Sequence, residues 1–341
     1  MTGVDDGVGD TPAFGVSATN SPVAVNLDLV VPATAAEAGE QPHGAPEGGE
    51  AQTSGGIGRQ ILRVFVEHKL AVASLAFIVL VILFCWVGPL VYHTNQTNQQ
   101  AALFNPENAP PGATGGKFPL GTTQTGFDVL GRLMFGGQAS MTVGLLSALV
   151  ATVVGVAYGA VAGFFGRWLD ALMMRIVDIV LSIPVLFLLI ALVTIFHSSE
   201  LLLIFVIAGV SWLVPARLVR GETLTLRTRE YVQAVRAMGG GGGRIIGRHI
   251  IPNAVGTIVV FATFQVATSI LILAALGFLG FGIPAPGTDW GTMLSNAVGT
   301  IGNGWWWEIY PVGALIVLVV VAFNFIGDAL RDALEVRTQR R

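Results

Sequence analysis

The sequence predicts an all-α membrane protein with six transmembrane helices and both termini in the cytoplasm. Hydrophobic residues make up 53% and charged residues only 11% of its 341 residues, whereas an average soluble domain carries about 25% charged residues. Long uncharged runs recur along the chain, and lysine and arginine gather in alternate connections between these runs. The composition therefore excludes an ordinary soluble enzyme and favours a function in the bilayer.

Six uncharged runs supply the predicted spans. A spanning helix needs about 20 apolar residues, and four of the runs come close to that length. The other two, 133–166 and 250–288, are too long for one helix, so we expect each to hold a span plus an interfacial or re-entrant piece. The six runs are 70–91, 133–166, 179–196, 201–216, 250–288 and 309–327.

The orientation of the spans follows from lysine and arginine, which concentrate on the cytoplasmic side of a membrane. An even number of spans places both termini on one side. Sixteen of the eighteen basic residues then fall on that side, and only Lys117 and Arg132 lie opposite. We therefore expect the termini and segment 217–248 to be cytoplasmic.

The first 55 residues contain eight acidic side chains and no lysine or arginine. Such a segment buries too little apolar surface to offset its ordering entropy, so we expect a disordered cytoplasmic tail. A signal peptide would need a basic start and an apolar core, and we expect none here. The single cysteine, Cys85, lies within the first predicted span, where we expect it to serve as a small packing residue.

Five consecutive glycines, residues 239–243, raise the question of a phosphate-binding loop. A P-loop needs G-x-x-x-x-G-K-[ST] after a strand, because its lysine reaches the phosphates and its hydroxyl holds magnesium. Gly242 and Gly247 have this spacing, but Arg248 and His249 follow, and no strand is predicted before the run. No register of G-x-G-x-x-G fits either. We therefore expect no nucleotide site in this chain.

The residues around these glycines predict a helical hairpin. Apolar side chains from Tyr231 to Met238 recur at helical spacing, with polar residues on the remaining surface. The glycines end this helix because each weakens a helix by about 1 kcal/mol and permits positive φ. A second amphipathic piece, 244–251, is closed by Pro252 and Asn253. The hairpin is either a membrane-surface connection or a docking element for a partner, and its periodicity leaves both open.

The stretch REYVQAVRAMGGGGGRIIGRHIIPN, residues 229–253, resembles the EAA loop of permease subunits of ABC importers. In that loop a short helix, a fixed glycine and a later element ending in Pro-Asn dock the membrane subunit onto its ATPase. Residues 233–235 stand where the family usually has Glu-Ala-Ala, and Gly239 stands at the motif glycine. The resemblance implies an ATPase-coupling site that comprises Tyr231, Gln233, Ala234, Val235, Ala237, Met238 and Gly239.

Five longer stretches resemble the second permease subunit of oligopeptide, dipeptide and nickel importers, which has a MetI-like fold. The resemblance runs from about residue 59 to the end of the chain. Thr123 and Phe127 depart from it, since Asp and Arg are common at these positions. The stretches are 119–137, 166–184, 216–232, 276–294 and 322–334.

This resemblance implies a heteromeric type I importer. The chain would pair with a homologous second permease and dock two ATPase subunits or one fused ATPase, which bind ATP and Mg²⁺. An extracytoplasmic solute-binding protein would deliver a peptide to the outer face. Nickel and glutathione importers share this subunit design, so they remain alternatives for the solute. In this chain we expect no cofactor, no metal site and no catalytic residue, and its surroundings are the lipid bilayer, with no nucleic acid.

The predicted organisation has four parts. Residues 1–58 form the acidic tail, and residues 59–135 form the first transmembrane helix with an extracytoplasmic loop. Residues 136–330 form the importer transmembrane domain and include a coupling loop at 221–253 between the fourth and fifth spans. Residues 331–341 form a basic cytoplasmic C-terminus.

Several positions within the spans carry further expectations. Small residues recur every four positions from 147 to 163, a spacing that lets transmembrane helices approach closely. Charged residues three apart are expected to pair near the interface, because a lone charge at mid-bilayer costs about 2.5 to 3.5 kcal/mol. The tryptophans at 305–307 fit an outer aromatic belt. The packing seam is Ser147, Ala151, Gly155, Gly159 and Gly163; the pairs are Arg175 with Asp178 and Asp328 with Arg331; the candidates for the solute path are Gln265, Thr268, Ser269, Asn296 and Asn324.

Two alternatives come from other classes of protein. A stand-alone secondary transporter or channel would need intramembrane acidic or histidine relays, or an inverted repeat with broken helices, and the spans offer few such groups. A membrane anchor for an ATPase would bind its partner without contributing to uptake. Uptake by the chain reconstituted alone separates the transporter from the importer subunit.

Overall fold

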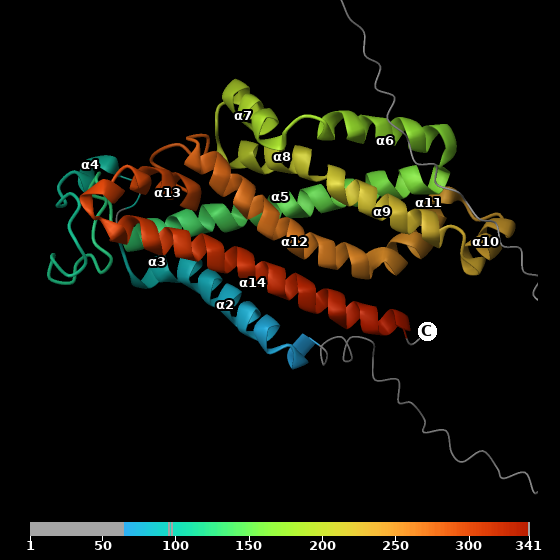
Figure 1. The fold of residues 1–341 in the computed structure, drawn as a ribbon, viewed down its shortest axis with the longest axis horizontal. Coiled ribbons are helices and arrows are strands. Elements are labelled where there is room, and N and C mark those ends of the chain that lie inside the picture. Colours follow the sequence, from blue (N-terminus) through green and yellow to red (C-terminus); the bar gives the residue numbers. More distant parts are fainter. Residues whose placement is uncertain (1–64, 95, 97, 340–341) are drawn as a thin grey trace, which may run out of the picture. The chain divides into compact units, whose positions relative to one another are not determined.

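The computed structural model describes residues 65–94, 96 and 98–339 (Figure 1). This part of the chain is helical and contains no strand, apart from one isolated antiparallel bridge between Thr122 and Asp128. The predicted tail, residues 1–58, lies outside the described residues. The all-α class predicted from the sequence agrees with the fold.

The helices fall into long, apolar elements and short connecting ones. They are α2 (Lys69–Trp86), α3 (Gly88–Val91), α4 (Gln99–Ala102), α5 (Val129–Phe165), α6 (Arg167–Leu181), α7 (Val185–Phe196), α8 (Glu200–Ser211), α9 (Leu213–Leu226), α10 (Glu230–Ala237), α11 (Gly242–Ile245), the π-helix η1 (Ile246–Ile250), α12 (Ile251–Phe278), α13 (Trp290–Val298), the 3₁₀-helix η2 (Ile301–Asn303) and α14 (Trp306–Gln339).

The described residues contain four helical segments that are long and apolar enough to cross a membrane, and up to six if two bent pairs count as one span each. The straight segments are Lys69–Val91, Val129–Phe165, Gly242–Phe278 and Trp306–Leu334. The first bent pair, α6 with α7, turns by 82°, and the second, α8 with α9, turns by 41°. The six predicted spans match the upper of these two counts, in which each bent pair is one broken span.

α5 is one uninterrupted helix of 37 residues, Val129–Phe165. The expected division of run 133–166 into a span and a separate piece is therefore wrong. The helix starts earlier than the run because the Asp128 carboxylate accepts hydrogen bonds from the amides of Leu130 and Gly131, at 3.2 and 3.1 Å, as an N-cap does. At 1.5 Å per residue α5 is about 55 Å long, so it extends beyond a hydrocarbon core of about 30 Å.

The long run at 250–288 holds α12 and, from residue 279 to 289, a non-helical segment. The expected stop at Pro252 and Asn253 is wrong, because α11, η1 and α12 follow one another without a break. The π-helix explains how the helix passes Pro252, which has no amide to donate. The Ile251 amide bonds instead to the Ile246 carbonyl five residues earlier, and this wider turn leads into the proline.

α5 lies at the centre of the packing and contacts α8, α9 and α12. One apolar cluster joins it to α2, α12, α13 and α14, and a second joins it to α6, α7, α8 and α12. Cys85 belongs to the first cluster and is fully buried, as expected for a packing residue. α5 therefore contributes side chains to both apolar clusters.

The short helices α4 and α13 lie at one end of the helix bundle, and α10 lies at the opposite end (Figure 1). Trp290 of α13 is fully buried, its amide bonded to Ser140 Oγ and its indole to the Leu133 carbonyl, both at 3.1 Å. Trp307 is also buried and donates to the Thr122 carbonyl at 3.3 Å. The tryptophans at 305–307 are therefore not one uniform interfacial belt, since Trp307 packs inside the protein.

Candidate coupling hairpin

The hairpin begins with α10, an amphipathic helix of eight residues, Glu230–Ala237. Arg229 precedes it in an extended conformation, which starts a new helix after α9. Glu230 in the first turn and Arg236 in the last turn both oppose the partial charges of the helix ends, so they favour this short helix. The sequence pattern and the helix therefore agree in type and position.

Gly239 and Gly240 cap α10 in the arrangement known as a Schellman motif. The Gly239 amide donates to the Arg236 carbonyl at 3.0 Å, and the Gly240 amide donates to the Val235 carbonyl at 2.9 Å. Gly239 has a φ of +82°, which a residue with a side chain adopts only at a cost. Because both amides bond to α10, they are not free to hold a phosphate.

At two positions in the glycine run, Gly240 and Gly242, a side chain would collide with its neighbours. A Cβ at Gly240 would lie 2.6 Å from Val235 Cγ1, and a Cβ at Gly242 would lie 2.9 Å from the Phe164 ring. Gly241 and Gly243 have open space around a Cβ. Three of the five glycines are therefore required by the geometry, and the structure gives no reason for the other two.

The inner face of the hairpin packs on the end of α5. Val232, Ile245 and Ile250 are buried and form one cluster with Phe164. The Arg236 guanidinium lies 5.1 Å from the centre of the Phe164 ring, a cation–π contact. The hairpin is thus attached to the end of α5 by an apolar cluster as well as by the chain itself.

The outer face of the hairpin carries the residues that the resemblance assigns to ATPase coupling. Six of the seven are exposed: Tyr231, Gln233, Ala234, Ala237, Met238 and Gly239. Met238 is 79% exposed, an unusual position for a large apolar side chain. The seventh, Val235, is half-buried against the cluster around Phe164. The hairpin therefore presents a small apolar surface away from the spans.

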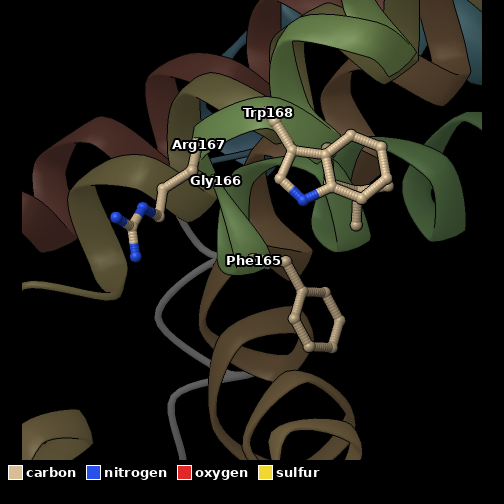
Figure 2. Close-up of a pocket in the computed structure, with 5 residues that line it drawn as sticks. Phe165, Gly166, Arg167 and Trp168 are labelled. Atoms are coloured by element: carbon tan, nitrogen blue, oxygen red, sulfur yellow. The ribbon is translucent and has the colours of Figure 1, made fainter.

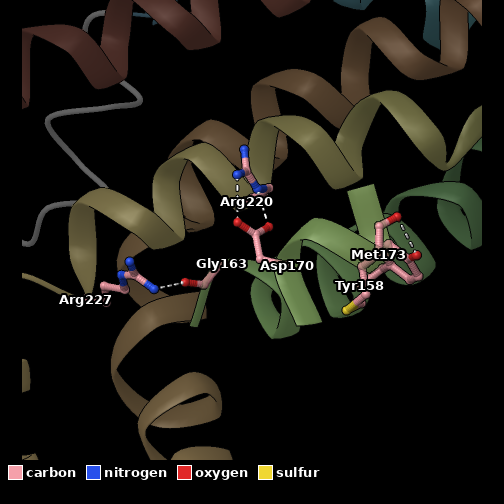
Figure 3. A network of polar contacts seen from close by, with 6 residues as sticks. All are labelled: Tyr158, Gly163, Asp170, Met173, Arg220 and Arg227. Atoms are coloured by element: carbon pink, nitrogen blue, oxygen red, sulfur yellow. Dashed lines mark hydrogen bonds and ion pairs between the residues drawn. The ribbon is translucent and has the colours of Figure 1, made fainter. Parts of the chain in front are cut away.

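Two arginines of α9 bind α6, and Arg227, which follows α9 and precedes the hairpin, binds α5 (Figure 3). The Arg220 guanidinium holds the Asp170 carboxylate with two hydrogen bonds, and Arg217 pairs with Asp178. The Arg227 guanidinium donates to the Gly163 carbonyl at 2.8 Å. Asp178 therefore pairs with a neighbouring helix instead of with Arg175, as the sequence suggested, because α9 brings a guanidinium to it.

The predicted packing seam of α5 faces α8 and α9. A Cβ at Gly155 would lie 2.7 Å from the Trp212 carbonyl oxygen, and one at Gly159 would lie 2.2 Å from the Ala216 carbonyl oxygen. A Cβ at Gly163 would lie 2.7 Å from Thr223 Cβ and 2.8 Å from the Arg220 carbonyl oxygen. Ser147 donates to the Ile204 carbonyl at 3.2 Å. Ala151 is fully buried. These contacts place the α9 backbone directly on α5.

The candidates for the solute path lie on three helices, α12, α13 and α14. Gln265 and Ser269 are buried and lie 3.5 Å apart, Nε2 to Oγ, on one turn of α12. Thr268 and Asn296 are exposed, and Asn324 is half-buried. The structure thus brings Gln265 and Ser269 together on α12, and the other three lie on α12, α13 and α14.

A hollow at the corner between α5 and α6 was not predicted from the sequence. Phe165, Gly166, Arg167, Trp168 and Leu169 line it. Figure 2 shows the side chains of Phe165, Arg167 and Trp168 extending from this corner in different directions. Gly166 and Arg167 both have positive φ, of 62° and 54°. The chain reverses there sharply, and Gly166 is the sequence signal for it.

Asp289 has a structural role that was not predicted from the sequence. It is fully buried, and its carboxylate accepts from the Ile283 and Thr292 amides at 2.9 and 3.0 Å and from Thr292 Oγ1 at 2.6 Å. An Asp immediately before a helix is an N-cap signal, and it could have located this start of α13. Within the described ranges, no group of three His, Cys, Asp or Glu side chains could hold a metal ion.

Several apolar spans, two of them bent, and a hairpin packed on their ends define a multi-pass membrane protein of the transporter class. The chain belongs to the family of binding-protein-dependent transport system inner membrane components, whose model matches residues 155–340. Residues 57–111 match the model of the N-terminal TM domain of oligopeptide transport permease C. It is therefore a multi-pass protein of the inner membrane.

Curated relatives match most of the chain. The dipeptide transport system permease protein DppC of Alkalihalophilus pseudofirmus is 39% identical over 277 residues, which cover 81% of this chain and 89% of the relative. The oligopeptide transport system permease protein OppC of Escherichia coli K12 is 40% identical over 273 residues, which cover 80% and 89%. OppC of Haemophilus influenzae is 38% identical over 277 residues, which cover 80% and 86%.

A solved structure of the MetNI methionine ABC transporter in inward-facing conformations has a similar fold. The TM-score is 0.50 with 23% sequence identity, and the match covers 59% of this chain and 96% of the other. At this identity the similarity concerns the fold alone. It supports a MetI-like arrangement of the spans.

Proposed function

We propose that this chain is the membrane-spanning permease subunit of an ATP-driven ABC importer for peptides. The observation that carries the proposal is the hairpin of α10 and α11, which has an inner face packed on Phe164 and an outer face exposed. Because the inner face is packed on α5, a partner protein that binds the exposed apolar face can transmit its movement to the spans. The family supports a transport subunit, and relatives named for peptide transport support the solute.

The hairpin and both termini lie in the cytoplasm in this proposal. Seven arginines between residues 217 and 248 support that orientation, since basic connections stay on the cytoplasmic side. The opposite end, with α4 and α13, then faces outward and meets the solute-binding protein. A second, homologous permease completes the path between the two subunits. The polar candidates that this chain contributes to it are Gln265, Thr268, Ser269, Asn296 and Asn324, of which Gln265 and Ser269 are buried.

ATP hydrolysis takes place in partner subunits. Two ATPases, or one fused ATPase, bind ATP and Mg²⁺ and close around them. Tyr231, Ala234 and the capping residue Met238 contact the ATPase, because all three are exposed and follow one another at spacings of three and four residues, which places them on one side of the hairpin helix. Small side chains such as Ala234 let the partner approach closely, and Met238 fills an apolar groove.

Co-purification of the complex tests the docking surface. Ala234→Arg is expected to abolish recovery of the ATPase with this chain, because a long charged side chain replaces a methyl group on the docking face. Gly239→Asp is expected to do the same by disturbing the cap of α10. Arg175→Ala, on an exposed position of α6, is the control and retains the ATPase. Stoichiometric ATPase with Ala234→Arg and Gly239→Asp would refute the docking surface.

Reconstitution tests the importer itself. Proteoliposomes with both permeases, the ATPase and the binding protein are expected to accumulate labelled tri-alanine only with ATP. Uptake by this chain alone would refute the importer. Mass spectrometry of ligands retained by the cognate binding protein distinguishes peptides from nickel and glutathione, because that protein receives the solute first.

A further inference from the structure

Arg227 lies at the neck of the hairpin, between α9 and α10. Its guanidinium Nη1 donates to the Gly163 carbonyl in the last turn of α5, at 2.8 Å. Its own carbonyl accepts from Gln233 Nε2 in α10, at 3.1 Å. One half-buried residue is thus bonded to a long span on one side and to the hairpin helix on the other.

The corner of α5 is shaped for this guanidinium. A Cβ at Gly166 would lie 2.6 Å from Arg227 Nη1, so a side chain there would displace the arginine. The Gly163 carbonyl is among the last four of α5, which have no amide partner within the helix. A cation at that end also opposes the negative pole of the helix. Shape and charge therefore both favour arginine at position 227.

Gln233 gives a reason for one departure from the EAA pattern. Its amide nitrogen donates to the Arg227 carbonyl, and a glutamate at the same position has no hydrogen to donate while it is ionised. The Gln233 amide thus bonds α10 to the segment between α9 and α10. The residue that stands in place of the motif glutamate holds the hairpin against its own subunit.

The same arginine-bearing helix holds α6. Asp170 and Asp178 of α6 are paired with Arg220 and Arg217 of α9, at two points eight residues apart along α6. Paired at two points, α6 cannot turn or slide freely against α9. α6 then leads into the 82° bend to α7. A displacement of α9 therefore reaches this bend.

We propose that Arg227 and Gln233 are positioning residues that make the hairpin move as one body with α9, α6 and the corner of α5. A push of the ATPase on α10 then passes through the neck to the bend between α6 and α7. Without these hydrogen bonds, only the apolar cluster around Phe164 and the Arg236 contact would join α10 to the spans, so a smaller part of its displacement would reach them. This inference rests on the proposed function, because it takes the ATPase as the source of the push.

The first experiment measures peptide transported per ATP hydrolysed, with labelled tri-alanine and the complete importer in proteoliposomes. Arg227→Gln is expected to lower this ratio at least five-fold while the ATPase stays bound. Arg227→Lys is expected to recover part of it, since an ammonium can donate to the Gly163 carbonyl. Arg175→Gln is the basic, exposed control and keeps the ratio. A merely structural role would lower the yield of complex and leave the ratio unchanged.

The second experiment does not depend on transport. Spin labels at Gly241→Cys, where a Cβ meets open space, and Trp168→Cys, with Cys85→Ala, report the distance between the hairpin and the α5–α6 corner in the assembled complex. The distance distribution is expected to be narrow in the parent and broad with Arg227→Gln or Gln233→Glu. An unchanged distribution in both variants overturns the inference even if the importer works. A narrow parent distribution that broadens in the variants, without any ATP-driven uptake by the parent, would instead refute the proposed function alone.

Discussion

The Arg220 guanidinium holds the Asp170 carboxylate in a two-pronged ion pair, with a distance of 2.7 Å between Nη2 and Oδ2. The two residues lie fifty positions apart in the chain and join the first turn of α6 to α9 (Figure 3). The Asp170 side chain is only 14% exposed. This pair therefore fixes where the bent span of α6 and α7 begins.

Asp170→Asn is expected to destabilise the protein by about 1 to 3 kcal/mol, because it leaves the Arg220 charge partly buried without its partner. The Arg217–Asp178 pair is about half exposed, so Asp178→Asn is the matched control and changes stability by less than about 1 kcal/mol. Thermal unfolding in detergent measures both. Equal effects of the two substitutions would contradict the stronger role of Asp170.

Gly159→Ala is expected to lower the melting temperature and the yield of folded protein. Its Cβ would lie 2.2 Å from the Ala216 carbonyl oxygen, so α9 would have to move away from α5. Gly221→Ala is the control, because nothing lies within 4 Å of a Cβ at that position in α9. The control is expected to be neutral or to stabilise by about 0.5 to 1 kcal/mol, as alanine does inside a helix. A stable Gly159→Ala protein would show that the seam tolerates separation.

Substitutions along the glycine run are expected to differ by position. Gly240→Ala forces a methyl group to 2.6 Å from Val235 Cγ1 and 2.8 Å from the Val235 carbonyl oxygen, whereas Gly241→Ala meets open space. We expect Gly240→Ala to reduce ATPase co-purification several-fold and Gly241→Ala to retain it. Gly243→Ala provides a second open control. Loss of binding with Gly241→Ala would mean that the run is needed for contacts with the partner.

Asp128 is expected to make stability depend on pH. Burial raises the pKa of this carboxyl above its usual range, although bonds from the Gly131 and Leu130 amides lower it. The folded state then binds the proton more tightly than the unfolded state, whose pKa is about 3.9. Stability from this group is greatest below pH 3.9 and falls as the pH rises through the raised pKa.

Asp128→Asn removes the charge and keeps one of the two capping bonds, because its single amide oxygen can accept from one backbone amide while its NH2 group cannot accept from the other. Melting temperatures between pH 4 and 7 are expected to show a growing advantage of Asp128→Asn over the parent. Asp128→Ala is the control that loses the cap, at a cost of about 1 kcal/mol. A constant difference between Asp128→Asn and the parent across this range would contradict a raised pKa.

Local features of the sequence determined the elements. Hydrophobic runs predicted the spans because a bilayer requires helices of a minimum length, and amphipathic spacing predicted α10 because its two faces meet different surroundings. The glycine at position 239 marked the end of α10, since a helix cap needs positive φ. The sequence failed at the start of α5 and at Pro252, where an N-cap at Asp128 and a π-turn decided the boundaries.

The tertiary structure alone decided which residues meet. Nothing in the spacing of Asp178 shows that Arg217 of α9 is its partner, because a neighbour three residues away on the same helix satisfies the same rule. The bond from Arg227 to the Gly163 carbonyl likewise requires α9 to lie on the glycine seam of α5. Helix formation depends on residues within a few positions, whereas these contacts depend on the packing of helices far apart in the chain. The hairpin could therefore be predicted from the sequence, and its attachment to the spans could not.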